Sequence, residues 1–475
     1  MDDAGGRFKL SLRPSSAFSA ELSGNLTYSF QNGYPYGVDN DSENRPVVEY
    51  NEKSRYKQLV GTTGLMLRYT TESLLLTSTT SYQGLKDFQG IDQDFLSDSI
   101  YFVMQDMRQN LVSEEITLRS NAASNYQWVI GTFGFYQAIR KIVDMDYRRL
   151  NYTTDKHYST NTRGIAVYHQ SSYKNLLIDG LTVGVGIRLD LESASQQFVP
   201  YKIDAAGITP QQPYDSELNF TEWIPKCYIS YDPTPTQTFY GSVAKGYKTG
   251  GFNDSFQKEP DRIFDPENSW NYETGYKCAL WNQAIKIDFA LFYIHWKNQQ
   301  VQYLDPEYNP PIPIIKNSGI SQSKGLELSV SANPIKRLEI DLQYGYTHAV
   351  FTRYKKDENT DYSGHFIPYI PKNTCSLTGI YTLTSHAGLC DRITLMGQYN
   401  GIGSMYWEET NQYKQNYYSL INAQITFFKG SQSLSVWGRN VFNSHYNTYL
   451  FYSAGNRFCQ QGKPASFGID LTIHL

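Results

Sequence analysis

Long apolar runs are missing from this 475-residue sequence. No segment reaches the roughly 18 consecutive apolar residues that a transmembrane helix requires, and the mean hydropathy is −0.50. The sequence therefore predicts no transmembrane helix. A membrane protein is still possible, because a transmembrane β-barrel distributes its apolar residues in alternation along many short strands.

Cysteine is scarce and charge of one sign is not concentrated anywhere. The five cysteines lie far apart and form no CxxC pair, so they indicate neither a disulfide framework nor a zinc site. They are Cys227, Cys278, Cys375, Cys390 and Cys459. The net charge of −4, with no basic block, argues against a protein that binds nucleic acid.

Catalytic motifs are also missing. The sequence contains no HExxH, GxSxG, Walker A or GxGxxG pattern. We therefore expect no enzyme activity, no catalytic residue, no metal site and no cofactor. Residues 39–44, with the sequence DNDSEN, offer oxygen ligands that suit Ca²⁺, but a solvated loop is the interpretation that we favour.

Alternation of apolar and polar residues is what the sequence does contain. Between Gly325 and His348 the apolar residues occupy every second position, except at the break Asn333-Pro334. A period of two gives each strand one apolar and one polar face, and the short break predicts an antiparallel hairpin. The whole chain repeats this unit and predicts about 19 strands in an all-β fold.

The connections between these strands alternate between short and long. Short turns such as Thr71-Glu72 and Gly430-Ser431 are each followed by a long polar segment. We expect all long segments to be irregular loops, including Arg148–Asn161 and Gln196–Glu217. Short turns at one end and long loops at the other are typical of outer-membrane barrels.

The two faces of each strand point to the same architecture. In the segment from Leu181 to Glu192, apolar residues alternate with a polar set that includes Arg188 and Asp190. A packed soluble core would reject those charges, whereas a water-containing barrel interior accepts them. The apolar set is long enough to cross a bilayer as a tilted strand of about 9–11 residues. The alternative is a soluble propeller or an array of sandwiches, but no blade motif recurs at a fixed spacing.

Four motifs resemble the C-terminal barrel of TonB-dependent outer-membrane receptors, particularly those of the siderophore-receptor type. The aromatic and glycine-rich segment Tyr240–Asn253 is similar to a strand that enters an extracellular loop in that family. The other three are Pro266–Lys277, with its PE…ExGxK pattern, Asn317–Glu327, with NxG…GxE, and Gly438–Tyr446, with RNVFNxxY. Their order and their spacing to the C-terminus also fit this family, so the resemblance covers roughly the whole chain.

The resemblance implies an antiparallel transmembrane β-barrel of 22 strands in the bacterial outer membrane. The first strand, Arg7–Leu12, precedes a short turn, so three strands and a plug domain would lie upstream of it. The opening MDDAGGRFKLSL lacks the features of a signal peptide. We therefore expect that residues 1–475 are the barrel domain of a receptor truncated at its N-terminus, either a gene fragment or half of a split receptor.

The resemblance also implies a function and a set of partners. The intact receptor would take up a scarce nutrient, most simply a ferric siderophore, driven by the TonB complex, with outer-membrane lipid around the barrel and a plug domain or upstream polypeptide completing it. A passive porin-like channel is the alternative from another class. A receptor of the same family for cobalamin, haem or an oligosaccharide is a third possibility.

Ligand-binding residues are expected in the long loops, where aromatic and cationic side chains suit an anionic, aromatic ligand. The alternative for each aromatic residue is an interfacial girdle or loop packing. The candidates are Tyr247, Lys248, Phe252, Tyr406, Trp407, Tyr449, Tyr452, Arg457 and Phe458.

Overall fold

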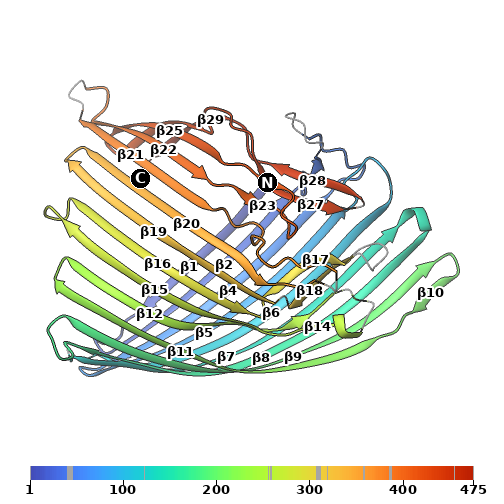
Figure 1. Ribbon diagram of the computed structural model, residues 1–475, viewed down its shortest axis with the longest axis horizontal. Coiled ribbons are helices and arrows are strands. Elements are labelled where there is room, and N and C mark those ends of the chain that lie inside the picture. Colours follow the sequence, from blue (N-terminus) through green and yellow to red (C-terminus); the bar gives the residue numbers. More distant parts are fainter. Residues whose placement is uncertain are drawn as a thin grey trace.

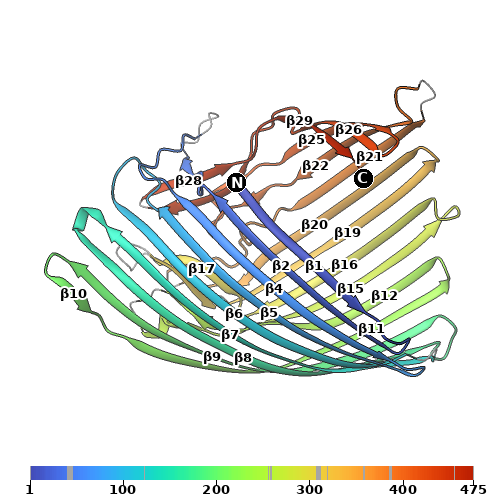
Figure 2. The same ribbon diagram turned by 180° about the vertical axis from the view of Figure 1, so that it is seen from behind.

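A computed structural model gives the arrangement of the chain. It describes residues 2–39, 46–121, 124–254, 256, 259–305, 312–317, 319–356, 359–384, 388–453 and 455–473. One large antiparallel sheet forms a curved wall: β1, β2 and β4 pass behind β16, β19 and β20 in Figure 1 and in front of them in Figure 2. Among the described residues no helix has both the length and the apolar character needed to span a membrane.

The sheet has 20 strands within the described residues. One of them is the short β10 (Gly207–Pro210), which pairs with β9, and this leaves 19 wall strands. The first ten are β1 (Asp2–Leu12), β2 (Phe18–Gln31), β4 (Arg55–Thr70), β5 (Leu74–Asp92), β6 (Tyr101–Ser120), β7 (Tyr126–Tyr147), β8 (Tyr152–Lys174), β9 (Leu181–Asp204), β11 (Tyr214–Thr234) and β12 (Gln237–Lys248). The others are β15 (Glu267–Leu280), β16 (Ile285–Lys297), β19 (Ile320–Ile335), β20 (Leu338–Arg353), β21 (Asn373–Thr384), β22 (Arg392–Ile402), β25 (Tyr418–Lys429), β26 (Gln432–Arg439) and β29 (Ser466–Ile473).

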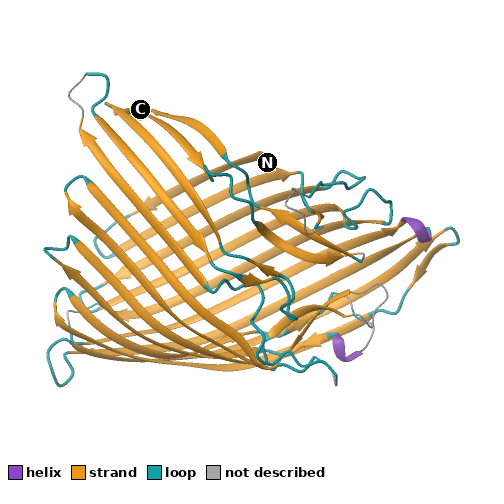
Figure 3. Ribbon diagram, turned by 45° about the horizontal axis from the view of Figure 1, so that its top comes forward, coloured by secondary structure: helices purple, strands orange, loops and turns teal. Residues whose placement is uncertain are grey.

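Smaller elements lie in the long connections, all at one end of the wall, on the right in Figure 1. They are the three-stranded sheet of β3 (Gly37–Val38), β27 (Asn447–Ser453) and β28 (Asn456–Gln461), and the pairs β13 (Gly251–Phe252) with β14 (Ile263–Phe264), β17 (Gln300–Asp305) with β18 (Ile312–Asn317), and β23 (Met405–Tyr406) with β24 (Lys414–Gln415). Two 3₁₀-helices, η1 (Arg148–Leu150) and η2 (Glu259–Asp261), which are purple in Figure 3, complete this loop end.

The predicted all-β fold of about 19 antiparallel strands is confirmed, and every wall strand pairs with its neighbours in chain order. Several of the expected irregular segments were wrong. Gln302–Gly319 contains most of the paired strands β17 and β18, and Asn447–Ala465 contains the paired strands β27 and β28. Two other segments extend the wall strands. Most of Arg148–Asn161 belongs to β8, and much of Gln196–Glu217 belongs to β9, β10 and β11. The outward residues of the β8 extension, such as Thr153 and Asp155, are polar, and Pro200 interrupts the β9 extension, so the regular apolar alternation on which the prediction depended is lost. The predicted strand Ser433–Tyr446 ends earlier, at Arg439.

The faces of the strands follow the predicted alternation. On β9, Val185 and Ile187 point outward and are about half exposed, while Arg188 and Asp190 point inward and form a 2.8 Å ion pair. The same outward face continues on β11 with the exposed residue Ile229, which is opposite Val183. An apolar outer surface with paired charges inside fits lipid outside and water inside.

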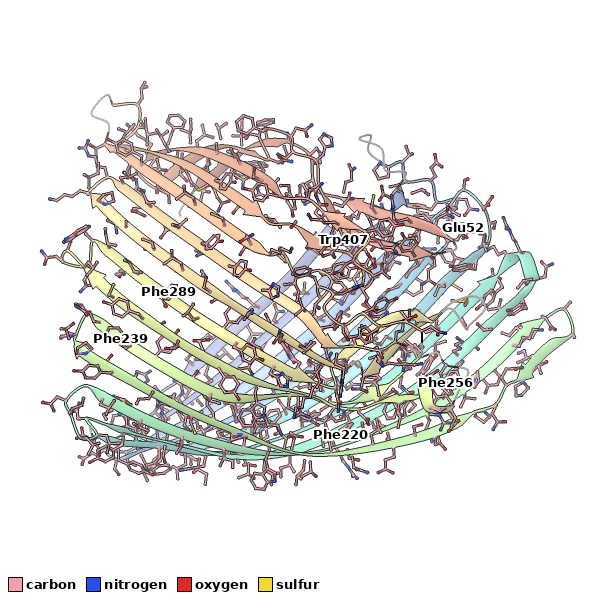
Figure 4. All side chains as sticks on the ribbon, viewed as in Figure 1. Glu52, Phe220, Phe239, Phe256, Phe289 and Trp407 are labelled. Carbon is pink, nitrogen blue, oxygen red and sulfur yellow. The ribbon has the colours of Figure 1, made fainter. Side chains whose placement is uncertain are left out.

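Tightly packed side chains gather at the loop end rather than along the wall. One cluster contains Phe351 and Tyr354, and another contains Trp407, Leu450 and Cys459. Figure 4 places Trp407 and Phe256 toward the loop end, whereas Phe239 and Phe289 lie nearer the short turns. The loops therefore form a packed layer over one mouth of the wall.

The outward placement of Ile229 gives a test. We expect Ile229→Arg to destabilise the protein in liposomes, lowering its free energy of unfolding by about 2 kcal/mol, because the guanidinium would meet lipid. The adjacent Ser230 points inward, so Ser230→Arg should change it by less than about 0.5 kcal/mol. Urea unfolding in liposomes measures both, and equal effects would contradict the assignment of the faces.

Candidate functional site

The loop end carries most of the residues expected to bind ligand. Six of the nine come together around the β27–β28 hairpin and the adjacent β23, and we call this group of loops the hairpin cluster. The other three are Tyr247 and Lys248, the last two residues of β12, and Phe252 on β13 in the connection that follows. The two groups are described in turn.

The hairpin cluster joins the two ends of the chain. Phe458 on β28 pairs with Val38 on β3, and the side chain of Arg457 forms a 2.9 Å ion pair with Asp39. Both charged side chains are more than four-fifths buried. A buried ion pair of this kind favours one arrangement of the loops, because separating it would leave a charge uncompensated.

Aromatic rings fill the interior of the hairpin cluster. Phe458 is fully buried, with its ring 5.5 Å from that of Phe95 and 5.7 Å from that of Phe451. Trp407 is also buried, at 5.5 Å from Tyr369. Phe458 and Trp407 thus have the loop packing that was the alternative to ligand contact. Burial also raises the pKa of the Cys459 thiol to about 11, which keeps it protonated.

The surface of the hairpin cluster presents the remaining candidates. Tyr449 is 40% exposed and stacks on Tyr369 at 5.9 Å. Tyr452 is comparably exposed and lies 5.6 Å from Tyr413, over which the Arg457 guanidinium is centred at 4.5 Å. The rings of Tyr449 and Tyr452 are thus partly open to solvent, whereas the Arg457 side chain is mostly buried and paired with Asp39.

Tyr406 belongs to a neighbouring stack. Its ring lies 5.7 Å from Phe366 with an interplanar angle of 20°, and the Lys372 ammonium sits 3.9 Å from the Phe366 ring centre. The Tyr406 carbonyl also accepts a hydrogen bond from the Tyr369 amide, at 2.8 Å, which connects this stack to the hairpin cluster.

The connection after β12 packs against the inner wall. Phe252 pairs with Ile263, and the next residue, Asn253, is buried, with its side-chain amide bound to the carbonyls of Asp261 and Ile315 at 2.8 and 2.9 Å. The Tyr247 hydroxyl is buried and has no hydrogen-bond partner among the described residues. Lys248, the last residue of β12, is exposed.

A ladder of aromatic residues on this side was missed from the sequence. The rings of Tyr158, Phe198, Tyr214 and Phe256 follow one another at 4.8 Å, and the Arg262 guanidinium lies 4.6 Å from the Tyr214 ring. Tyr158, Phe198 and Tyr214 lie on strand extensions that had been taken for irregular loops. Their spacing at inward positions of β8, β9 and β11 was the signal that could have found them.

The chemistry of this end is that of recognition. Several aromatic faces carry a cation within about 6 Å of their centres, an arrangement that suits anionic and aromatic ligands. The described residues contain no group of three His, Cys, Asp or Glu side chains that could hold a metal ion. Of the candidate Ca²⁺ loop, Asp39 is engaged by Arg457, and 40–44 lie outside the described residues.

A titratable group is buried in the same layer. Glu409 accepts hydrogen bonds from the Tyr354 hydroxyl at 3.1 Å on both carboxylate oxygens, and burial raises its pKa from 4.5 to about 7. The folded loop thus holds a proton that the unfolded loop releases. Its stability should be highest below pH 4.5 and should fall as the pH rises to about 7.

We therefore expect hydrogen exchange of the loop between β22 and β25, corrected for the intrinsic rate, to quicken as the pH rises through this window. Glu409→Gln keeps an acceptor for Tyr354 and should remove the dependence. The exposed wall residue Glu339 provides the control, since Glu339→Gln should leave the profile as it was. If hydrogen exchange of this loop still depended on pH in the Glu409→Gln variant, the dependence could not be assigned to Glu409.

Comparisons with protein families, with individual protein sequences and with solved structures gave matches that agree with one another. The sequence matches the family described as TonB dependent receptor-like, beta-barrel, over residues 8–441. It is 23% identical over 419 residues to the pesticin receptor of Yersinia pestis, covering 86% of this chain and 57% of that protein. It is 24% identical over 251 residues to the ferripyoverdine receptor of Pseudomonas aeruginosa, covering 49% and 28%.

Among solved structures, the ferric yersiniabactin uptake receptor FyuA from Yersinia pestis superposes with a TM-score of 0.85 at 18% identity, over 99% of this chain and 70% of that chain. At 18% identity, this similarity shows a shared fold only. The chain spans little more than half the length of the pesticin receptor.

Proposed function

The chain belongs to the TonB-dependent receptor family, a family of transporters rather than enzymes, and from this premise we propose that it forms the outer-membrane barrel of a receptor for ferric siderophores. The observation that carries the proposal is the loop end, where exposed aromatic faces and cations lie over the mouth of a wall with a polar interior. The ferripyoverdine receptor among the relatives and the ferric yersiniabactin uptake receptor among the similar structures add support. The barrel supplies the wall and the binding surface, and it breaks no bond.

Binding is proposed to use the exposed part of the candidate set. Tyr449 and Tyr452 offer ring faces, and the exposed Lys248 offers a charge, to a ligand that is anionic and aromatic. Trp407 and Phe458 would hold the hairpin cluster in shape from inside. A plug domain and the TonB complex are the proposed partners for the transport step.

The test is growth under iron limitation with a panel of defined siderophores, with and without the gene. We expect one siderophore to support growth only when the gene is present. In the purified protein, Tyr449→Ala with Tyr452→Ala should weaken binding of that siderophore about tenfold. Tyr69→Ala, at the short-turn end, is the control and should bind normally.

Other outcomes separate the alternatives. If growth did not differ across the panel, the protein would not be a siderophore receptor. Growth supported by haem, cobalamin or an oligosaccharide only when the gene is present would assign that compound as the cargo. Passive leakage of small solutes through the isolated protein would favour a porin-like channel.

We also propose that an upstream segment of three strands closes the wall. Within the described residues β1 pairs with β2 alone and β29 pairs with β26 alone. Both strands run toward the short-turn end, so they would be parallel neighbours if they met. An antiparallel closure therefore needs an odd number of strands between them, and three would complete the 22 strands of this class of transporter.

Closure predicts that every backbone amide of β1 is protected from hydrogen exchange in the full protein held in nanodiscs, because each N–H in lipid needs a partner. Amides of β25, which is paired on both sides, give the fully protected reference. Rapid exchange at every second residue of β1 would contradict a closed barrel.

A further inference from the structure

Two buried carboxyl groups meet where β5 passes into the connection to β6, residues 93–100. Asp92 is the last residue of β5 and Asp94 lies two positions later, and each residue is only 1% exposed. A hydrogen bond joins the two side chains. Two carboxylates cannot form such a bond, because their oxygens are all acceptors. The contact therefore contains a proton, and one of the two carboxyls is neutral.

The backbone amides around the pair show which side chain carries the charge. Asp94 accepts three of them, at 3.0, 3.0 and 3.2 Å, from Leu96, Ile100 and Tyr101. Asp92 accepts one, at 2.8 Å, from Glu52, which lies toward the loop end in Figure 4. Hydrogen bonds from amides favour the charged form of a carboxyl, so the proton belongs to Asp92, which donates it to Asp94. Burial and the adjacent charge of Asp94 raise the pKa of Asp92 to about 7.

The other charged groups of the adjacent segments do not neutralise the pair. Several of them form ion pairs with one another, namely Arg148 with Glu52 and Asp146, and Arg149 with Asp98. The cations Lys53 and Arg55, beside the N-terminal end of β4, are exposed. Within the described residues neither Asp92 nor Asp94 has an ion pair. The proton is thus the means by which the two carboxyls stay together.

The same connection contributes a core ring to the hairpin cluster. Phe95 is 6% exposed and lies 5.5 Å from both Phe451 and Phe458. Its φ of +54° is in the left-handed region, which a bulky residue adopts only where the surrounding structure holds it. Gln93, the residue between the two carboxyls, accepts a hydrogen bond on its carbonyl from Ser453 of β27, at 3.4 Å. The carboxyl pair therefore sits at the attachment of this connection to the hairpin cluster.

We propose that the pair of Asp92 and Asp94 is a proton-operated latch that fastens the connection between β5 and β6 to the hairpin cluster. Loss of the proton leaves two negative charges in contact without water, and separating them relieves the repulsion. The separation withdraws Phe95 from the hairpin cluster. Tyr36 lies 5.1 Å from Phe95 and 6.0 Å from Tyr449, so the exposed Tyr449 ring loses support as well. The latch needs no ligand, whereas its effect on ligand binding rests on the proposed function.

The sign of the pH dependence follows from the proton. The docked connection holds a proton that the detached connection, with the ordinary carboxyl pKa of 3.8, releases. Detachment should therefore become more favourable by about tenfold per pH unit between pH 4 and pH 7, and should change little above pH 7. Hydrogen exchange of the three amides that donate to Asp94, corrected for the intrinsic rate, measures this in the full protein in nanodiscs. A wild-type profile that is flat between pH 5 and pH 7 would overturn the proposal.

Asp92→Asn is the decisive variant, because its amide can donate to Asp94 as the protonated carboxyl does. Exchange of the three amides should then be slow and independent of pH. Asp98→Asn, in the same connection but exposed, is the matched control and should keep the wild-type profile, as should Glu409→Gln. A pH dependence that persisted in Asp92→Asn, or that disappeared in Glu409→Gln, would overturn the assignment to this pair.

Binding of the siderophore identified by the growth test separates the latch from the proposed function. At pH 8, Asp92→Asn should bind it about threefold more tightly than the wild type, because its hairpin cluster is assembled in a larger fraction of molecules, and at pH 5 the two should bind equally. Equal affinities at pH 8 would overturn the coupling of the latch to binding. If no siderophore bound at all, the proposed function would fail, and the exchange profile would still decide the latch.

Discussion

Pairing of backbone groups is the constraint on which this structure depends. A strand surrounded by lipid has no water to bond its N–H and C=O groups, so each must find a partner on an adjacent strand. The continuous antiparallel order from β1 to β29 meets this need with short turns between neighbours. The long polar connections lie at one end of the wall, outside the lipid, where water and other loops are available as partners.

The two faces of the wall serve different surroundings, and the same alternation provides both. Inward positions place charges such as Arg188 and Asp190 in contact, and outward positions such as Val185 keep the surface apolar. Toward the loop end this division changes. There the inner face of β8, β9 and β11 carries the rings of Tyr158, Phe198 and Tyr214.

The sequence predicted the wall well because alternation is a local property. The order of the strands and the location of the long connections followed from it. So did the division of the side chains between Leu181 and Glu192 into an outward apolar set and an inward polar set. The extensions of β8 and β9 were missed, since residues above the membrane need not be apolar on either face. The ladder of Tyr158, Phe198 and Tyr214 was not predicted, because residues this far apart in sequence become neighbours only through the strand register. The burial of Phe458 depends in the same way on Phe95, from a distant loop.

The hairpin cluster connects the beginning of the chain to its end, since Asp39 and Arg457 are 418 positions apart. A contact of such sequence separation is entropically expensive until the intervening strands have assembled. It can therefore form only after the sheet has curled far enough to bring its first and last loops together. The interlock of β3 with β28 is thus a late event in folding, and its presence reports that the wall has reached its native curvature.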